Sequence, residues 1–140
     1  NVVGAYQMLR ACAPKLKESG CGAVVNVASV AGVFGIGSSA AYAASKGALI
    51  TLTKSMARAL APEIRVNAVC PGFVGTRWFK DRAPSEDAFK NTLDRVAANT
   101  PLKHAGTPDD VADGIVFFCA EALSLVTGET LLLDAGSHLS

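Results

Sequence analysis

Two short apolar runs constrain the fold more than any other feature of this chain. Residues 23–27 read Ala-Val-Val-Asn-Val, and residues 65–69 read Arg-Val-Asn-Ala-Val. Runs of this length, rich in β-branched residues, are typical of parallel strands that are buried on both faces of a sheet. Residues 130–133, Thr-Leu-Leu-Leu, predict a third strand near the end of the chain.

Helical patterns alternate with these predicted strands. Residues 1–18 carry apolar and small residues at helical spacing, and so do residues 40–61. The run Thr-Pro-Asp-Asp at 107–110 predicts the start of a helix that reaches about residue 120, because Thr is a good N-cap and Pro and acids suit the first turn. Between these helices we expect a glycine-rich loop up to about residue 39 and one or two short helices in residues 71–106. The order α-β-α-β-α-β predicts an α/β fold with a doubly wound parallel sheet.

Length and charge narrow the classes of function. The chain has 140 residues and is 50% hydrophobic, which is enough for one core in one domain. Its 13 basic and 12 acidic residues are spread along the chain, so nothing favours nucleic acid or an anionic membrane as a partner. Residues 19–45 carry no charge, but five glycines interrupt this stretch and make a membrane-spanning helix implausible.

The cysteines give no sign of a metal site. Cys12, Cys21, Cys70 and Cys119 form no CxxC pair and have no metal-ligand spacing. We therefore expect no metal, and we interpret the cysteines as buried free thiols in a reducing compartment, which favours a cytoplasmic protein.

A tyrosine and a lysine at the start of the second predicted helix suggest chemistry. Tyr42 and Lys46 are four residues apart, so they lie on one helical face. A nearby ammonium favours the phenolate form of a tyrosine, which lets the phenol give or take a proton near neutral pH. Ser29, thirteen positions before Tyr42, supplies a hydroxyl that can hold a carbonyl or alcohol oxygen. A tyrosine–lysine pair alone is more often an ordinary surface pair, so the surrounding motifs decide.

Those motifs resemble one known family. Residues 24–32 (Val-Val-Asn-Val-Ala-Ser-Val-Ala-Gly), 42–49 (Tyr-Ala-Ala-Ser-Lys-Gly-Ala-Leu) and 65–76 (Arg-Val-Asn-Ala-Val-Cys-Pro-Gly-Phe-Val-Gly-Thr) follow one another in the order and spacing of the short-chain dehydrogenase/reductase family, in its compact single-domain branch. The closing segment looks most similar to 3-oxoacyl-carrier-protein reductases. The resemblance implies that residues 1–140 are the C-terminal, catalytic part of one Rossmann-type domain.

The resemblance also implies roles for individual residues. Ser29 matches the serine that orients the substrate, and Tyr42 matches the catalytic acid/base. Lys46 matches the lysine that favours the phenolate and hydrogen-bonds the nicotinamide ribose. Asn1 resembles the asparagine that supports a proton relay to that lysine. An NAD or NADP cofactor is implied, with further contacts from the turn and segment after the second predicted strand: Pro71, Gly72, Val74 and Thr76.

The phosphate-binding glycine turn of a dinucleotide fold is not evident in this chain. The only glycine cluster, Gly32, Gly35 and Gly37, has the spacing GxxGxG instead of GxGxxG. The family's first half is therefore expected upstream of Asn1, and the 140 residues alone are expected to be inactive.

The leading hypothesis is an NAD(P)-dependent oxidoreductase that interconverts a small-molecule secondary alcohol and a ketone. A sugar-nucleotide epimerase or dehydratase shares the tyrosine–lysine pair, but its extra substrate domain does not fit the short segment after residue 133. A non-catalytic binding protein of the same fold is the third possibility. The resemblance further implies a homodimer or homotetramer built on the helices at 1–18 and 40–61.

Overall fold

Three parallel strands form the sheet of the computed structural model, which describes residues 1–139. The strands are β1 (Gly22–Val27), β2 (Ile64–Pro71) and β3 (Thr130–Leu133), with β2 in the centre. Gly22 pairs with Ile64 at one end of the β1–β2 ladder, and Val69 pairs with Leu131 in the β2–β3 ladder. The predicted strands and their parallel arrangement are confirmed.

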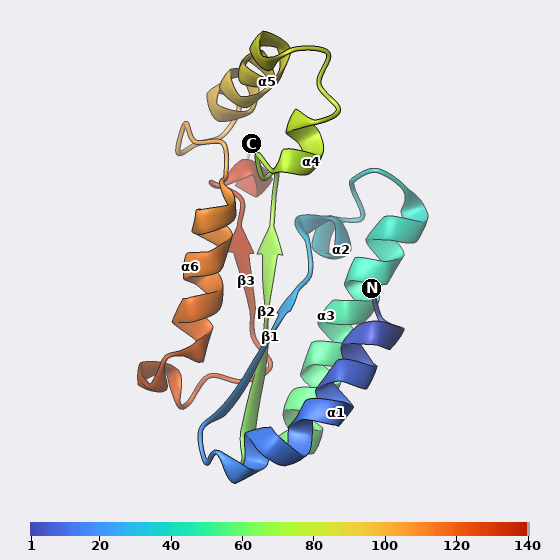
Figure 1. Cartoon of the computed structure of the whole chain (residues 1–140), viewed down its shortest axis with the longest axis vertical. Helices are drawn as coiled ribbons and strands as arrows, with labels where there is room; N and C mark the ends of the chain where they lie inside the picture. The colour runs from blue at the N-terminus through green and yellow to red at the C-terminus, as the bar shows by residue number, and fades with distance from the viewer. Residues whose placement is uncertain (140) are drawn as a thin grey trace.

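Helices cover both faces of this sheet (Figure 1). Helix α1 (Val3–Glu18) and helix α3 (Ala40–Leu60) lie on one face, and α6 (Pro108–Cys119) lies on the other. The central strand is buried because both layers pack on it, and Val66, Ala68 and Val69 are fully inaccessible to solvent. Two clusters form the core on the α1 and α3 side, and they centre on Leu9 with Ile64 and on Leu49 with Ala68.

Two polar side chains fasten the central strand to the segment that leads into β3. Asn67 is buried, donates from Nδ2 to the Val126 carbonyl at 3.0 Å, and accepts the Glu129 N–H at 3.0 Å. Arg65 donates to the Phe118 carbonyl at 2.8 Å, near the end of α6. These bonds satisfy backbone groups at the end of α6 and in the segment before β3 that helix and sheet leave unpaired.

Two expectations from the sequence need correction. The predicted glycine-rich loop contains a short helix, α2 (Val30–Phe34), which packs against α3. The cysteines were expected to be buried, but only Cys70 is, while Cys12, Cys21 and Cys119 are exposed. Burial raises the pKa of the Cys70 thiol.

Two short helices form a lobe beyond the end of β2, as the sequence predicts: α4 (Arg77–Lys80) and α5 (Glu86–Ala98). Two 3-10 turns complete the described chain, at Glu121–Leu123 and Ser137–Leu139. Within residues 1–139, no helix is both long and apolar enough to cross a membrane.

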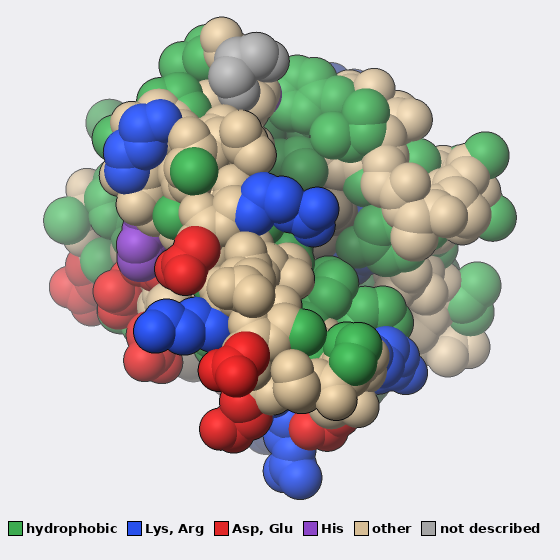
Figure 2. Space-filling view, turned by 90° about the horizontal axis from the view of Figure 1, so that it is seen from above, with side chains coloured by type: hydrophobic (Ala, Val, Ile, Leu, Met, Phe, Trp, Pro, Cys, Tyr) green, Lys and Arg blue, Asp and Glu red, His purple; other side chains and the backbone are tan. Residues whose placement is uncertain are grey.

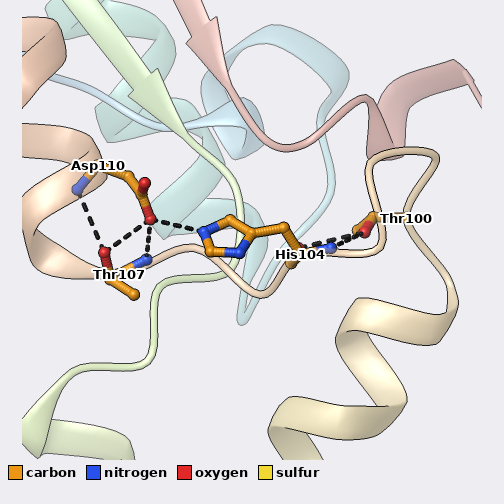
Figure 3. Close-up of polar contacts among 4 residues, drawn as sticks. All are labelled: Thr100, His104, Thr107 and Asp110. Atoms are coloured by element: carbon orange, nitrogen blue, oxygen red, sulfur yellow. Dashed lines mark hydrogen bonds and ion pairs between the residues drawn. The ribbon is translucent and has the colours of Figure 1, made fainter.

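The start of α6 is held by a polar network around Asp110 (Figure 3). Thr107 caps the helix by accepting the Asp110 N–H, and the Asp110 carboxylate accepts the hydroxyl and the N–H of Thr107, each at 2.7 Å. The His104 ring, 2.9 Å from the same carboxylate, connects it to the loop before α6. The bonds from Thr107, then from His104, lower the pKa of Asp110 to about 2.

We expect Asp110→Asn to destabilise the fold near neutral pH. The pKa of Asp110 is lower in the folded state, about 2 against 3.8, so its contribution to stability is present above about pH 4 and is lost as the pH falls through about 2. The urea midpoints of wild type and variant should therefore converge across that window. Asp109→Asn is the matched control, because Asp109 is also in the first turn of α6 but makes none of the hydrogen bonds of the network. Parallel midpoint curves for wild type and Asp110→Asn would contradict this account.

Candidate active site

Ser29 lies directly beyond the carboxyl end of β1. It is 8% exposed and occupies the N-cap of α2, where its Oγ accepts the Ala31 N–H at 3.1 Å. An accepting hydroxyl keeps its own proton to donate. Ser29 is therefore fixed in position and still able to hold an oxygen atom of a bound molecule.

Tyr42 and Lys46 lie in the first turns of α3, whose N-terminus is capped by Ser39. The Lys46 Nζ is 5.8 Å from the centroid of the Tyr42 ring, so the pair shares one helical face as predicted. Lys46 also donates to the carbonyl of Val27 at 2.9 Å. This bond attaches the start of α3 to the end of β1, two residues before Ser29.

A close backbone contact brings the serine segment against the tyrosine helix. A Cβ atom at Gly32 would lie 2.5 Å from the backbone N of Gly47 and 2.5 Å from the backbone C of Lys46. Only a residue without a side chain allows this approach between α2 and α3. The contact sets the position of Ser29 relative to Lys46. The sequence shows the two glycines, Gly32 and Gly47, but not that they touch.

Asn1 contacts the same helix through Ser45. Its Nδ2 donates to the Ser45 Oγ at 3.0 Å, and Ser45 in turn donates to the Tyr42 carbonyl at 2.8 Å. The structure thus brings Asn1 to Ser45, the residue before Lys46.

The predicted cofactor-binding segment follows the end of β2. Gly72 donates to the Leu133 carbonyl at 3.0 Å, and a Cβ there would lie 2.8 Å from the Cβ of Asp134. Pro71 and Gly72 therefore form a turn that packs tightly on the end of β3. Val74 pairs with Gly106 in an isolated bridge, which directs the chain toward α4.

Thr76 occupies the N-cap position of α4 without using its hydroxyl as a cap. Its N–H donates to the Val74 carbonyl at 2.7 Å. Thr76 is partly exposed, and its hydroxyl does not cap α4, so the hydroxyl can bind a ligand.

The carboxylate of Asp134, directly after β3, orders the neighbouring turn. No role was predicted for this residue from the sequence. Asp134 is buried, which raises its pKa, but hydrogen bonds from His138, Ser137 and the Gly136 N–H outweigh burial and lower it. The His138 Nδ1 lies 2.9 Å from the carboxylate, and the ring stacks on Phe34 with centroids 5.9 Å apart. This stack links the end of the chain to the end of α2, the helix that begins after Ser29. The position of Asp134 directly after a predicted strand was the one feature of the sequence that could have pointed to it.

A cavity of about 590 Å³ lies between α6, β3 and the loop before α6. Phe73, Leu102, Phe117, Asp134 and His138 are among its lining residues. Ser29, Tyr42 and Lys46 do not line it, so the serine–tyrosine–lysine group lies outside this cavity. No group of three or more metal-ligating side chains within residues 1–139 is arranged to hold a metal ion.

Known proteins resemble this chain in sequence and in fold. A family model described as enoyl-(acyl carrier protein) reductase matches residues 1–138. The short-chain dehydrogenase/reductase homolog YusR of Bacillus subtilis is 44% identical over 136 residues, covering 97% of this chain and 98% of YusR. A solved 3-oxoacyl-[acyl-carrier protein] reductase from Brucella melitensis is 33% identical with a TM-score of 0.84, and the match covers 100% of this chain and 51% of that one. The structure of ElxO with NADP bound is 32% identical with a TM-score of 0.86, covering 100% and 56%.

These matches differ in how much of each relative they cover. Apart from YusR, the chain spans between 43% and 60% of the length of the curated relatives compared with it. It therefore corresponds to about half of most of these relatives.

Proposed function

Because the chain belongs to the short-chain dehydrogenase/reductase family, we propose that it carries the catalytic residues of an NAD(P)-dependent oxidoreductase that interconverts a secondary alcohol and a ketone. The observation that carries this proposal is the placement of Ser29, Tyr42 and Lys46 around the contact between α2 and α3. The Brucella relative supports the substrate class, since its name describes reduction of an oxo group.

Two of the three side chains act directly on the substrate oxygen in ketone reduction. The Ser29 hydroxyl donates a hydrogen bond to the carbonyl oxygen and holds it near Tyr42. The Tyr42 O–H gives its proton to that oxygen as negative charge develops, and in the oxidation direction it takes the proton back. When bound, a nicotinamide dinucleotide would supply the hydride in reduction and accept it in oxidation. Asn1, through Ser45, supports the start of α3 and is assigned to the proton relay.

The residues at the ends of β1 and β2 fit the nicotinamide end of such a cofactor. The Lys46 ammonium is a hydrogen-bond donor beside the Tyr42 ring, which suits the hydroxyls of a ribose. The Thr76 hydroxyl does not cap α4 and suits a phosphate or carboxamide group. We therefore assign NAD or NADP binding to Tyr42, Lys46, Pro71, Gly72, Val74 and Thr76.

Lys46→Met tests the assignment of the cofactor site. Activity is measured in this chain joined to a dinucleotide-binding half, hereafter the joined enzyme. Loss of a charge-assisted hydrogen bond should weaken NAD(P)H binding by about tenfold or more, as read by cofactor fluorescence. Lys54→Met, an exposed lysine two turns further along α3, is the control and should bind normally. Equal affinities for the two variants would remove Lys46 from the cofactor site.

Assembly and location complete the proposal. A homodimer or homotetramer that pairs α1 and α3 is supported by large apolar side chains of α1 that remain exposed, such as Val3, Tyr6 and Met8. A cytoplasmic location is supported by the three exposed free thiols, which suit a reducing compartment.

A further inference from the structure

Three aromatic rings stand in a row between the end of β2 and α4. Phe73 directly follows the Pro71–Gly72 turn, and its ring lies 4.8 Å from that of Phe79 at a tilt of 40°. The Phe79 ring also contacts the Trp78 ring, with centroids 4.8 Å apart and the rings edge-on at 84°. We call Phe73, Phe79 and Trp78 the aromatic row. It begins at the edge of the sheet where Ser29 also lies and leads away from it along α4.

The outer part of this row is not buried in the core. Trp78 is 56% exposed and Phe79 is 39% exposed, although both side chains are large and apolar. Figure 2 shows hydrophobic side chains on this end of the molecule, among basic and acidic ones. Exposed aromatic surface that continues from a proposed catalytic edge is suited to an apolar ligand.

A guanidinium covers the end of the row. The Cζ of Arg82 lies 4.0 Å from the centroid of the Trp78 ring, and Nη1 donates to the Trp78 carbonyl at 3.0 Å. Stacking on an aromatic face holds a guanidinium in one orientation and leaves other N–H groups at its edge to bind an anion.

Arg82 also lacks the acidic partner that the other cations of this segment have. Arg77 pairs with Asp81 at 3.4 Å, and Lys80 pairs with Glu86 at 2.9 Å. Among residues 1–139, no carboxylate forms an ion pair with Arg82. An oriented guanidinium without a carboxylate is complementary to a ligand that brings one.

We propose that the aromatic row and Arg82 bind the part of the substrate remote from the reacting carbon, and that this part is an apolar segment ending in a carboxylate. The inference rests on the proposed function, because it takes the carbonyl end of the substrate to lie at Ser29 and Tyr42. The apolar segment lies along Phe73, Phe79 and Trp78, and the carboxylate accepts hydrogen bonds from the edge of the Arg82 guanidinium.

Tryptophan fluorescence tests this binding without turnover, because Trp78 is the single tryptophan of the chain. The chain is titrated with 8-oxononanoate, a methyl ketone with a terminal carboxylate, and with nonan-2-one, an uncharged ketone of the same length. We expect the carboxylate to bind about tenfold more tightly, which is the contribution of one charge-assisted hydrogen bond. Arg82→Met should remove this difference between the two ketones. Arg77→Met, which breaks only the pair with Asp81, should keep it.

Turnover by the joined enzyme separates failure of this inference from failure of the proposed function. Arg82→Met should raise KM, and so lower kcat/KM, about tenfold more for 8-oxononanoate than for nonan-2-one. Equal affinity of wild type for both ketones, or equal losses in Arg82→Met and Arg77→Met, would overturn the inference. Selective binding of the carboxylate without turnover of either ketone would support the inference as a binding site and overturn the oxidoreductase assignment.

Discussion

Replacing Tyr42 with phenylalanine should lower ketone reduction by the joined enzyme by at least about 100-fold, the lower end of what a general acid–base group contributes. The substitution removes one oxygen and keeps the ring, so the contact of the ring with Lys46 and the fold of α3 remain. NAD(P)H binding should therefore change little. Steady-state kinetics and cofactor titration on the same preparation measure the two effects separately.

Tyr6 provides the matched control, because the chain has two tyrosines and Tyr6 lies on α1. Tyr6→Phe should retain wild-type turnover. A Tyr42→Phe variant that reduces ketones at nearly the wild-type rate would remove Tyr42 from the reaction, and with it the proposed mechanism.

Gly32→Ala should be strongly destabilising and should disable the site as well. The added methyl would lie 2.5 Å from two backbone atoms, the N of Gly47 and the C of Lys46, neither of which can move without displacing α3. Inserting a methyl into packed structure costs roughly 1–3 kcal/mol, and a backbone obstacle places this case at the upper end. Since the same contact positions Ser29 against Lys46, turnover should fall together with the urea midpoint.

Alanine substitutions at two other glycines provide comparisons for the loss of stability in Gly32→Ala. A Cβ at Gly47 would meet the Gly32 carbonyl oxygen at 3.3 Å, so Gly47→Ala should be milder. Gly4 has open space around it in α1, and alanine there should be neutral or slightly stabilising. If Gly32→Ala were as stable as Gly4→Ala, the contact between α2 and α3 would not be as tight as described.

Local pattern was enough to predict the sheet and its main helices. An apolar run predicted β1, and Thr107 with Pro108 predicted the start of α6. Both signals lie within a few consecutive residues, so they can be recognised in the sequence. Helix α2 was missed because Val30–Phe34 is short and contains a glycine, and its helical form depends on packing against α3. The burial of the cysteines was wrong for three of four, since cysteine content does not say which helix face a thiol occupies.

The sequence predicted which residues belong to the candidate site, but not which contacts hold most of them in place. The pairing of Tyr42 and Lys46 follows from helical spacing, so the sequence contained it. The bond from Lys46 to the Val27 carbonyl and the covering of Trp78 by Arg82 depend on how the chain folds back in space. The roles of these residues in catalysis and cofactor binding remain predictions, to be tested by the variants described above.

The most direct test of the central claim follows a single hydrogen atom. The joined enzyme is given a methyl ketone and a nicotinamide cofactor that carries deuterium at its transferable position, and the alcohol is examined by mass spectrometry. Our account predicts that the alcohol carries one deuterium on the carbinol carbon and that Tyr42→Phe forms this product at least about 100-fold more slowly. Absence of labelled alcohol from a wild-type enzyme shown to bind the cofactor would contradict it.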